Sequence, residues 1–184
     1  MIITRTKLVK THACSDGLRF FDQHFSAGEA TQEEVFEAIA KYAPTTSWQR
    51  WLALSLRLTA TCRRWYPDGQ PREEELYVAG KLHGLRRTWY ANGKPREEET
   101  YVAGYLHGLR SSWWADGKPC AEDTWVDGKL HGLLRTWYSN GTPQVEETWE
   151  AGKRHGLRMA WYYGGTPPVE ETWYRGKRVT TNIR

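Results

Sequence analysis

The sequence predicts a mainly β protein, an elongated antiparallel β-meander preceded by a small α-helical cap. Residues 63–178 carry a 24-residue unit five times over, and each copy holds two short runs rich in Trp, Tyr, Thr and Val. Residues 1–62 lack the unit and show helical spacing instead. We therefore expect three parts: a helical N-terminal module (1–62), five β-hairpin repeats (63–178) and a polar C-terminal tail (179–184).

The N-terminal module contains signals for three short helices. Thr31 and Glu34 form a capping box at the start of an apolar pattern that should end before Pro44. Ser47 is a plausible N-cap for a second helix, and the segment SDGLRFFDQHF places its apolar residues on one face of a third. So small a cluster is marginal on its own, and it is expected to cap the first hairpin. The alternative is a second binding module.

The repeat predicts two kinds of turn in each copy. Asp-Gly or Asn-Gly pairs end the first run, because these residues tolerate positive φ. The second turn, of type G-K-L-H-G, is expected to be the longer one. The landmark glycines are Gly69, Gly93, Gly117, Gly141 and Gly165, and the landmark prolines are Pro71, Pro95, Pro119, Pro143 and Pro167.

One aromatic residue recurs at every half-period of the repeat, once for each expected strand. In an antiparallel meander this step predicts a single aromatic ladder across strands about 4.8 Å apart. The ladder consists of Trp65, Tyr77, Trp89, Tyr101, Trp113, Trp125, Trp137, Trp149, Trp161 and Trp173. The aromatic residues that follow directly should point to the other face; they are Tyr66, Tyr90, Trp114, Tyr138 and Tyr162.

Three motifs of the repeat resemble a known family. They are the strand WYxNG, the acidic EEETY and the link GKLHG, and they cover about two-thirds of the chain. Together they resemble the MORN repeat, in the variant form found in YwqK-like bacterial antitoxin and immunity proteins. The resemblance implies an elongated β-sheet without catalysis, and binding to a protein or a membrane surface.

Composition and charge limit the function classes. The formal net charge is +4, which is too small to indicate nucleic acid, although the aromatic ladder leaves stacking on single strands as an alternative. Three widely spaced cysteines argue for a reducing compartment. The N-terminus has no apolar signal region, and the protein is expected in the cytoplasm.

No residue set predicts catalysis, a cofactor or a metal site. The row His83, His107, His131 and His155 has a spacing of roughly 9.6 Å between successive imidazoles, too wide for one zinc ion. We expect a structural role in the turns for this row, and His12 and His24 do not complete a cluster. The paired acidic residues recur in all five copies, whereas an active site is normally single; they are expected to form a solvated surface. The chain is therefore not expected to be an enzyme.

The leading hypothesis is a protein-binding repeat protein, of the antitoxin, immunity or inhibitor type. The basic residues around the second turn are expected to gather along one edge, apart from the acidic runs, and to attract an acidic partner surface. This edge comprises Lys81, Arg86, Arg87, Arg110, Lys129, Arg135, Lys153 and Arg158. The aromatic ladder would supply short-range contacts or hold the sheet together. Alternatives are a scaffold protein or one that binds acidic phospholipids, and a phage-type inhibitor of a host defence complex.

Overall fold

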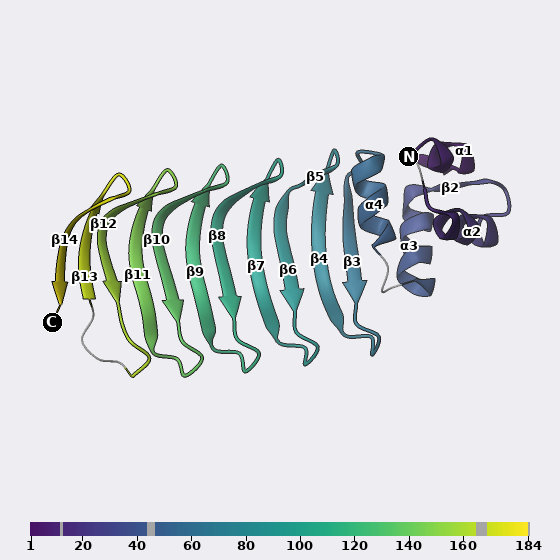
Figure 1. The fold of residues 1–184 in the computed structure, drawn as a ribbon. Helices are drawn as coiled ribbons and strands as arrows, with labels where there is room; N and C mark the ends of the chain where they lie inside the picture. Colours follow the sequence, from purple (N-terminus) through teal and green to yellow (C-terminus); the bar gives the residue numbers. More distant parts are fainter. Residues whose placement is uncertain (12, 44–46, 165–168, 184) are drawn as a thin grey trace. The chain divides into compact units, whose positions relative to one another are not determined.

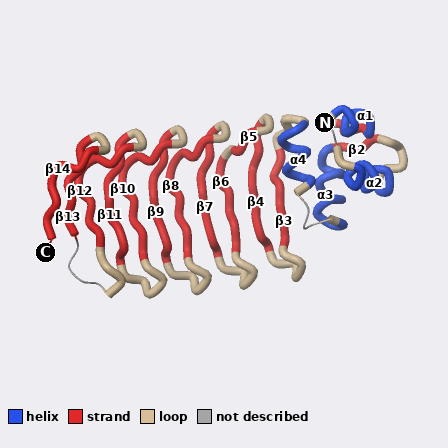
Figure 2. The backbone as a smooth tube through the Cα atoms, in the orientation of Figure 1, coloured by secondary structure: helices blue, strands red, loops and turns tan. Residues whose placement is uncertain are grey.

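The structure, a computed structural model, describes residues 1–11, 13–43, 47–164 and 169–183. The predictions that involve His12, Pro44, Gly165, Pro167 and Arg184 lie outside these residues. The chain divides into two units, Met1–Lys81 and Leu82–Arg184. The predicted fold class is confirmed: small N-terminal helices precede antiparallel strands that follow one another in chain order (Figures 1 and 2).

The first unit begins with four helices and a small two-stranded sheet. The helices are α1 (Arg5–Lys10), α2 (Ser15–His24), α3 (Gln32–Tyr42) and α4 (Trp48–Ser55), and the strands are β1 (Ile2–Thr4) and β2 (Glu29–Thr31). The capping box of α3 is confirmed, because Thr31 Oγ1 accepts a bond from the Glu34 amide at 3.2 Å and Glu34 Oε2 accepts one from the Thr31 amide at 2.7 Å. The sequence did not predict α1, β1 or β2, because these elements are too short to show a period.

The first hairpin belongs to this unit, and α4 packs on it. The hairpin consists of β3 (Ala60–Trp65) and β4 (Pro71–Val78), with β5 (Lys81–Leu82) at the end of the unit. The buried side chain of Gln49 on α4 donates to the carbonyl of Phe36 at 2.8 Å and accepts from the amide of Arg63 at 2.8 Å. The core is apolar and contains Ile3, Leu8, Phe21, Ala30, Val35, Phe36, Ile39, Leu52, Ala53, Leu58, Ala60, Cys62 and Tyr77.

The second unit is an antiparallel meander. Its strands are β6 (Gly84–Trp89), β7 (Pro95–Val102), β8 (Tyr105–Trp113), β9 (Pro119–Val126), β10 (Lys129–Trp137), β11 (Pro143–Glu150), β12 (Lys153–Ala160), β13 (Val169–Tyr174) and β14 (Lys177–Ile183). Each strand pairs with the next in the chain. The predicted tail from residue 179 onward is thus largely part of β14, where Thr180 is the register partner of Thr172.

The two turns of the repeat have the reverse of the expected lengths. The Asn-Gly turn joins β6 to β7 through five residues, 90–94, and Gly93 has the predicted positive φ of 79°. The G-K-L-H-G side is the tighter one, because Ala103 and Gly104 alone join β7 to β8, with φ of 51° and 93°. Two consecutive residues at positive φ are typical of the two-residue type I′ hairpin. The residues that follow it, up to His107, are already part of β8.

Unequal turns overturn the prediction of one aromatic ladder. Trp89 is the register partner of Pro95, whereas Tyr101 is the partner of Gly84, at the opposite end of β6. Trp89 and Tyr101 are therefore separated by five residues along the strands, or about 17 Å. The aromatic residues form two rows. The long-turn row contains Trp89, Trp113, Trp137 and Trp161, and the short-turn row contains Tyr101, Trp125, Trp149 and Trp173.

Candidate binding surface

Strand alternation gives the second unit two faces with different chemistry. On one, which we call the ion-ladder face, register partners place basic and acidic side chains in alternation. Its central row runs Arg86, Glu99, Arg110, Asp123, Leu134, Glu147, Arg158 and Glu171. The other, which we call the leucine face, carries Leu85, Leu109, Leu133 and Leu157, each one residue before a member of that row on the same strand.

The acidic residues of the ion ladder are buried, contrary to the expectation of a solvated acidic surface. Asp123 is 1% exposed and accepts bonds from Arg110, the shortest at 2.7 Å. Arg86 Nη1 lies 2.6 Å from a carboxylate oxygen of Glu99, which is 6% exposed. Burial lowers the pKa of Arg110, but its hydrogen bonds and attraction to Asp123 outweigh this effect and raise the pKa overall. In each acidic run of the second unit, one carboxylate is therefore buried within the sheet structure.

The short-turn row completes the coordination of these carboxylates. Tyr101 Oη donates to Glu99 at 3.2 Å, and Trp149 Nε1 donates to Glu147 at 2.9 Å. Trp125 donates to Asp123 in the same way. Each ring lies two residues after the carboxylate that it contacts, so both project from the same face of one strand. Burial, followed by the charge of Glu99, raises the pKa of Tyr101 to about 12.

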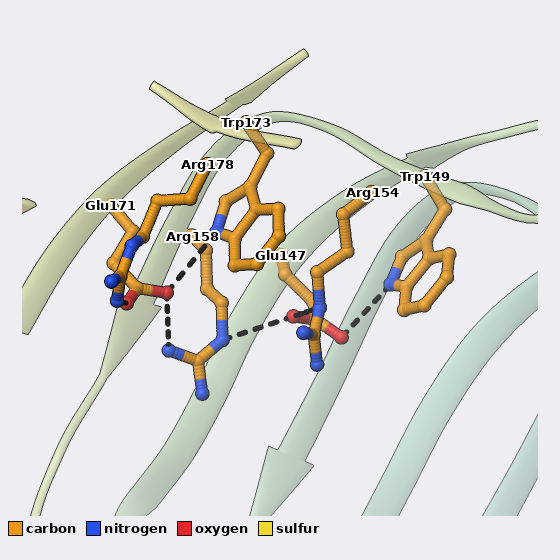
Figure 3. A network of polar contacts seen from close by, with 7 residues as sticks. All are labelled: Glu147, Trp149, Arg154, Arg158, Glu171, Trp173 and Arg178. Atoms are coloured by element: carbon orange, nitrogen blue, oxygen red, sulfur yellow. Dashed lines mark hydrogen bonds and ion pairs between the residues drawn. The ribbon is translucent and has the colours of Figure 1, made fainter. Parts of the chain in front are cut away.

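One repeat departs from the ladder and is compensated by another residue (Figure 3). Leu134 stands where Arg86, Arg110 and Arg158 stand in other repeats, and Arg154 stands where the preceding repeats have leucine. Arg154 Nε donates to Glu147 Oε2 at 2.9 Å. Its guanidinium carbon lies 5.4 Å from the ring centroid of Trp149 and 5.1 Å from that of Trp173. A guanidinium thus sits between two indoles and binds a carboxylate.

The same network ends at Glu171. Arg158 bridges two carboxylates, because its Nε lies 3.1 Å from Glu147 and its Nη1 lies 2.9 Å from Glu171. Arg178 Nη1 reaches Glu171 at 2.9 Å. Burial raises the pKa of Glu171, but hydrogen bonds from Arg178, Trp173 and Arg158 outweigh this and hold it below its usual value.

The predicted separation of a basic and an acidic edge is wrong for the arginines. Arg86, Arg110 and Arg158 lie within the strands beside buried carboxylates. Arg87 and Arg135 lie on the leucine face and form exposed ion pairs with Glu98 at 3.1 Å and Glu146 at 2.9 Å. Three of the eight residues assigned to the basic edge do lie there. They are Lys81, Lys129 and Lys153, which are exposed beside short turns.

The turn residues connect each repeat to the next. The Nδ1 atoms of His83 and His131 accept bonds from backbone amides 20 residues later, those of Ala103 and Ala151, both at 3.4 Å. His107 Nδ1 lies 3.3 Å from an Asp127 carboxylate oxygen. These contacts link the histidines to the next short turn, although His107 and His131 themselves belong to β8 and β10. In the part of the chain that the structure describes, no three His, Cys, Asp or Glu side chains come together as a metal site would require.

The tyrosines of the long turns have a comparable role. Tyr90 Oη donates to the carbonyl of Trp113 at 2.8 Å, and Tyr138 Oη donates to that of Trp161 at 2.9 Å. Both tyrosines lie in the long turn, one residue beyond the end of their strand. Strand alternation, on which their predicted placement on the opposite face depended, therefore does not apply to them.

The leucine face carries a row of exposed apolar side chains that a partner can contact. Leu85, Leu109, Leu133 and Leu157 are 38%, 56%, 36% and 48% exposed. They recur every second strand, or about 9.6 Å, and form a regular stripe. Sequence reasoning missed this stripe because the leucines adjoin the predicted G-K-L-H-G turn. The signal was present, since each leucine directly follows a landmark glycine of the series Gly84, Gly108, Gly132 and Gly156.

The first unit offers a different kind of site. A cavity of ≈ 280 Å³ lies among the helices and is lined mainly by apolar side chains, including Leu8, Phe20, Trp48 and Trp51. Cys14, an exposed and unpaired thiol, also lines it. Across the described residues, no helix has the length and apolar character needed to cross a membrane.

Comparison with known proteins agrees with the repeat architecture. Three segments, 58–79, 82–103 and 130–151, match the family described as MORN repeat variant. Each match begins beside a short turn and includes one long-turn hairpin. A search among curated proteins gave no match. These three segments are therefore similar to MORN repeats, and repeats of this kind generally bind proteins or membranes.

Proposed function

We propose that this chain is a non-catalytic binding protein and that its leucine face contacts a protein partner. The observation that carries the proposal is the stripe formed by Leu85, Leu109, Leu133 and Leu157. The leucines alternate with Thr100, Thr124 and Thr148 in the register of the sheet, and a regular row of exposed leucines on one face is typical of an interaction surface. The stripe lies on a sheet whose shape is held by the ion ladder on the other face, so it offers a preformed surface.

The finer proposal is a masking role of the antitoxin, immunity or inhibitor type, in the cytoplasm. It is supported by the resemblance of the repeat motifs and by the length of the stripe, which would cover an extended area of a partner. A phage-type inhibitor of a host defence complex is one form of the same masking role. The acidic partner surface expected from the sequence would contact the short-turn edge, where Lys129 and Lys153 are exposed.

Affinity capture from the source cell, read by mass spectrometry, tests the proposal. The bait is the full chain, compared with a variant that carries Leu109→Ser, Leu133→Ser and Leu157→Ser. The matched control carries Val102→Ser and Val126→Ser, which remove comparably exposed apolar side chains beside the short turns. A partner retained by the control and lost by the triple variant is the expected result. Equal capture by all three proteins would contradict the assignment of the face.

A membrane-surface function is the second candidate, and the short-turn edge favours it. Lys129, Lys153 and Lys177 are exposed there, and Tyr105 and Tyr174 are 62% and 56% exposed. Aromatic rings beside lysines are typical of contact with acidic lipid headgroups. Co-sedimentation with phosphatidylserine vesicles, lost on Lys129→Glu with Lys153→Glu and absent with phosphatidylcholine alone, would support this candidate over the first.

A further inference from the structure

An open pocket of ≈ 310 Å³ lies near the long turns of β10, β11 and β12. Arg135, Glu146 and Met159 line it and are successive register partners, so they share the leucine face. Trp137 and Trp161 line it two residues further along the chain from Arg135 and Met159, and they are neighbours in the long-turn row. The pocket therefore has indole walls one repeat apart and a carboxylate from the strand between them.

The chain fills a site of this composition with its own arginine elsewhere on the same sheet. Near the short turns, Arg154 lies between Trp149 and Trp173 and donates to Glu147 at 2.9 Å (Figure 3). In both places the two tryptophans occupy the same position in successive repeats, and a glutamate of β11 lies beside them. The difference is that the residue of β12 that lines the pocket near the long turns is Met159, which is uncharged.

Carboxylates outnumber guanidinium groups in the row of register partners that includes Glu146. The row on this face runs Glu122, Arg135, Glu146, Met159 and Glu170 as register partners. It holds three carboxylates and one guanidinium, and that guanidinium is bound to Glu146 at 2.9 Å. A glutamate of this sheet accepts two guanidinium groups where the geometry permits, as Glu147 does with Arg154 and Arg158. One further cation beside Glu146 thus fits both the charge and the bonding pattern.

We propose that this pocket receives the guanidinium of an arginine side chain presented by the protein partner. The guanidinium stacks between Trp137 and Trp161 and donates to Glu146. A planar group with five N–H donors suits two indole faces and a carboxylate better than a compact ammonium does. The inference rests on the proposed binding function and names the chemistry of one contact within it.

Titration with Nα-acetyl-arginine amide tests the pocket without a partner. The readout is the indole ¹H–¹⁵N signals of the full chain, assigned with single Trp→Phe variants. Saturable shifts are expected for Trp137 and Trp161, with weaker shifts from the lysine analogue and none from the neutral citrulline analogue. Glu146→Gln should weaken binding about tenfold, because it removes a charge-assisted hydrogen bond.

Two variants separate the pocket from general effects. Glu98→Gln is the matched control, because Glu98 lies on the same face and also pairs with an arginine, and it should leave the titration unchanged. Met159→Arg places the chain's own guanidinium in the pocket and should abolish the shifts. Equal shifts from citrulline, or equal weakening by Glu98→Gln, would overturn the proposal. If the leucine variants still lose the captured partner in that case, the binding function stands and only the arginine pocket falls.

Discussion

The two units of this chain are stabilised by opposite means. Met1–Lys81 has an apolar core in which Ile3, Phe21 and Tyr77 are at most 1% exposed. Among the described residues of Leu82–Arg184, no hydrophobic side chain is buried, and four of the five buried side chains are carboxylates. A sheet with no layer packed on it lacks apolar burial, and a cross-strand ion ladder takes its place.

The comparison is sharpest at equivalent repeat positions. Cys62 is the register partner of Glu75 in the first hairpin, as Arg86 is of Glu99 in the next repeat. The helical unit supplies the missing cation from another element, because Arg50 on α4 lies 3.7 Å from Glu75. Beneath α4, the position of the arginine is taken by Cys62, and the cation that pairs with Glu75 comes from the helix. Where water covers the sheet, the row carries paired charges.

The largest effect is expected from breaking the ion ladder at its most buried carboxylate. Arg110→Glu leaves Asp123 without its bidentate partner and adds a like charge beside it, and it should cost about 3–5 kcal/mol. Circular dichroism melting of the full chain measures the loss. Arg87→Glu is the control, because it breaks an exposed pair with Glu98 and should cost about 0–1 kcal/mol. Equal losses would show that the ladder does not act as the core.

A smaller effect separates the two units at the aromatic position. Tyr77→Trp enlarges a side chain that is 1% exposed, and overpacking should cost about 1–3 kcal/mol. Tyr101→Trp should be almost neutral, since Trp125 and Trp149 occupy the equivalent position and donate to the same kind of carboxylate. Melting temperatures of both variants decide the matter, and a large loss from Tyr101→Trp would contradict the repeat equivalence.

Acid should weaken the end of the ladder at Glu171. The pKa of Glu171 is lower in the folded chain than in the unfolded chain. Its contribution to stability is therefore present above the unfolded value, about 4.3, and is lost as pH falls through the folded value. Fluorescence of Trp173, isolated by difference with Trp173→Phe, should change over that range. Glu171→Gln should remove most of the change, and an unaltered acid transition in this variant would contradict the assignment.

The smallest effect is expected where the ladder lacks an arginine. Leu134→Arg inserts a guanidinium between Asp123 and Glu147, its register partners, and should change stability by about 0–1 kcal/mol in the favourable direction. Cys62→Arg makes the same change beneath α4, where the side chain is 3% exposed, and should be strongly unfavourable. Urea denaturation measures the change in the free energy of unfolding for each variant. Changes of opposite sign would support the comparison between the units, and changes of the same sign would contradict it.

Local signals in the sequence predicted the features that depend on neighbouring residues, although not the short elements α1, β1 and β2. The capping box of Thr31 and Glu34 and the positive φ of Gly93 were predicted because both depend on neighbouring residues only. The single aromatic ladder failed because it depended on equal turn lengths. A step of half a repeat places Trp89 opposite Tyr101 only if both turns have the same length. Here one turn contains five residues and the other contains two, so the two side chains lie near opposite ends of β6.

The candidate site was harder to predict because carboxylates are usually exposed to water, so the acidic residues were expected on a solvated surface. The pattern that contradicts this was visible: Glu99, Asp123 and Glu147 each precede a Tyr or Trp by two residues, and arginines recur at 86, 110 and 158. Only strand pairing shows that these two patterns meet. The leucine stripe was missed for the related reason that its residues adjoin a predicted turn.

The exchange between Leu134 and Arg154 has a consequence for how the array folds. Repeats of nearly identical sequence permit strands to pair one whole repeat out of step, an error to which repeat proteins are prone during folding. In a uniform array such an arrangement would satisfy every pair equally well. Here, strands displaced by a full repeat would place Leu134 or Arg154 beside the wrong carboxylates. A buried carboxylate would then lack its cationic partner. Leu134 and Arg154 thus break the translational symmetry of the array and favour the correct alignment.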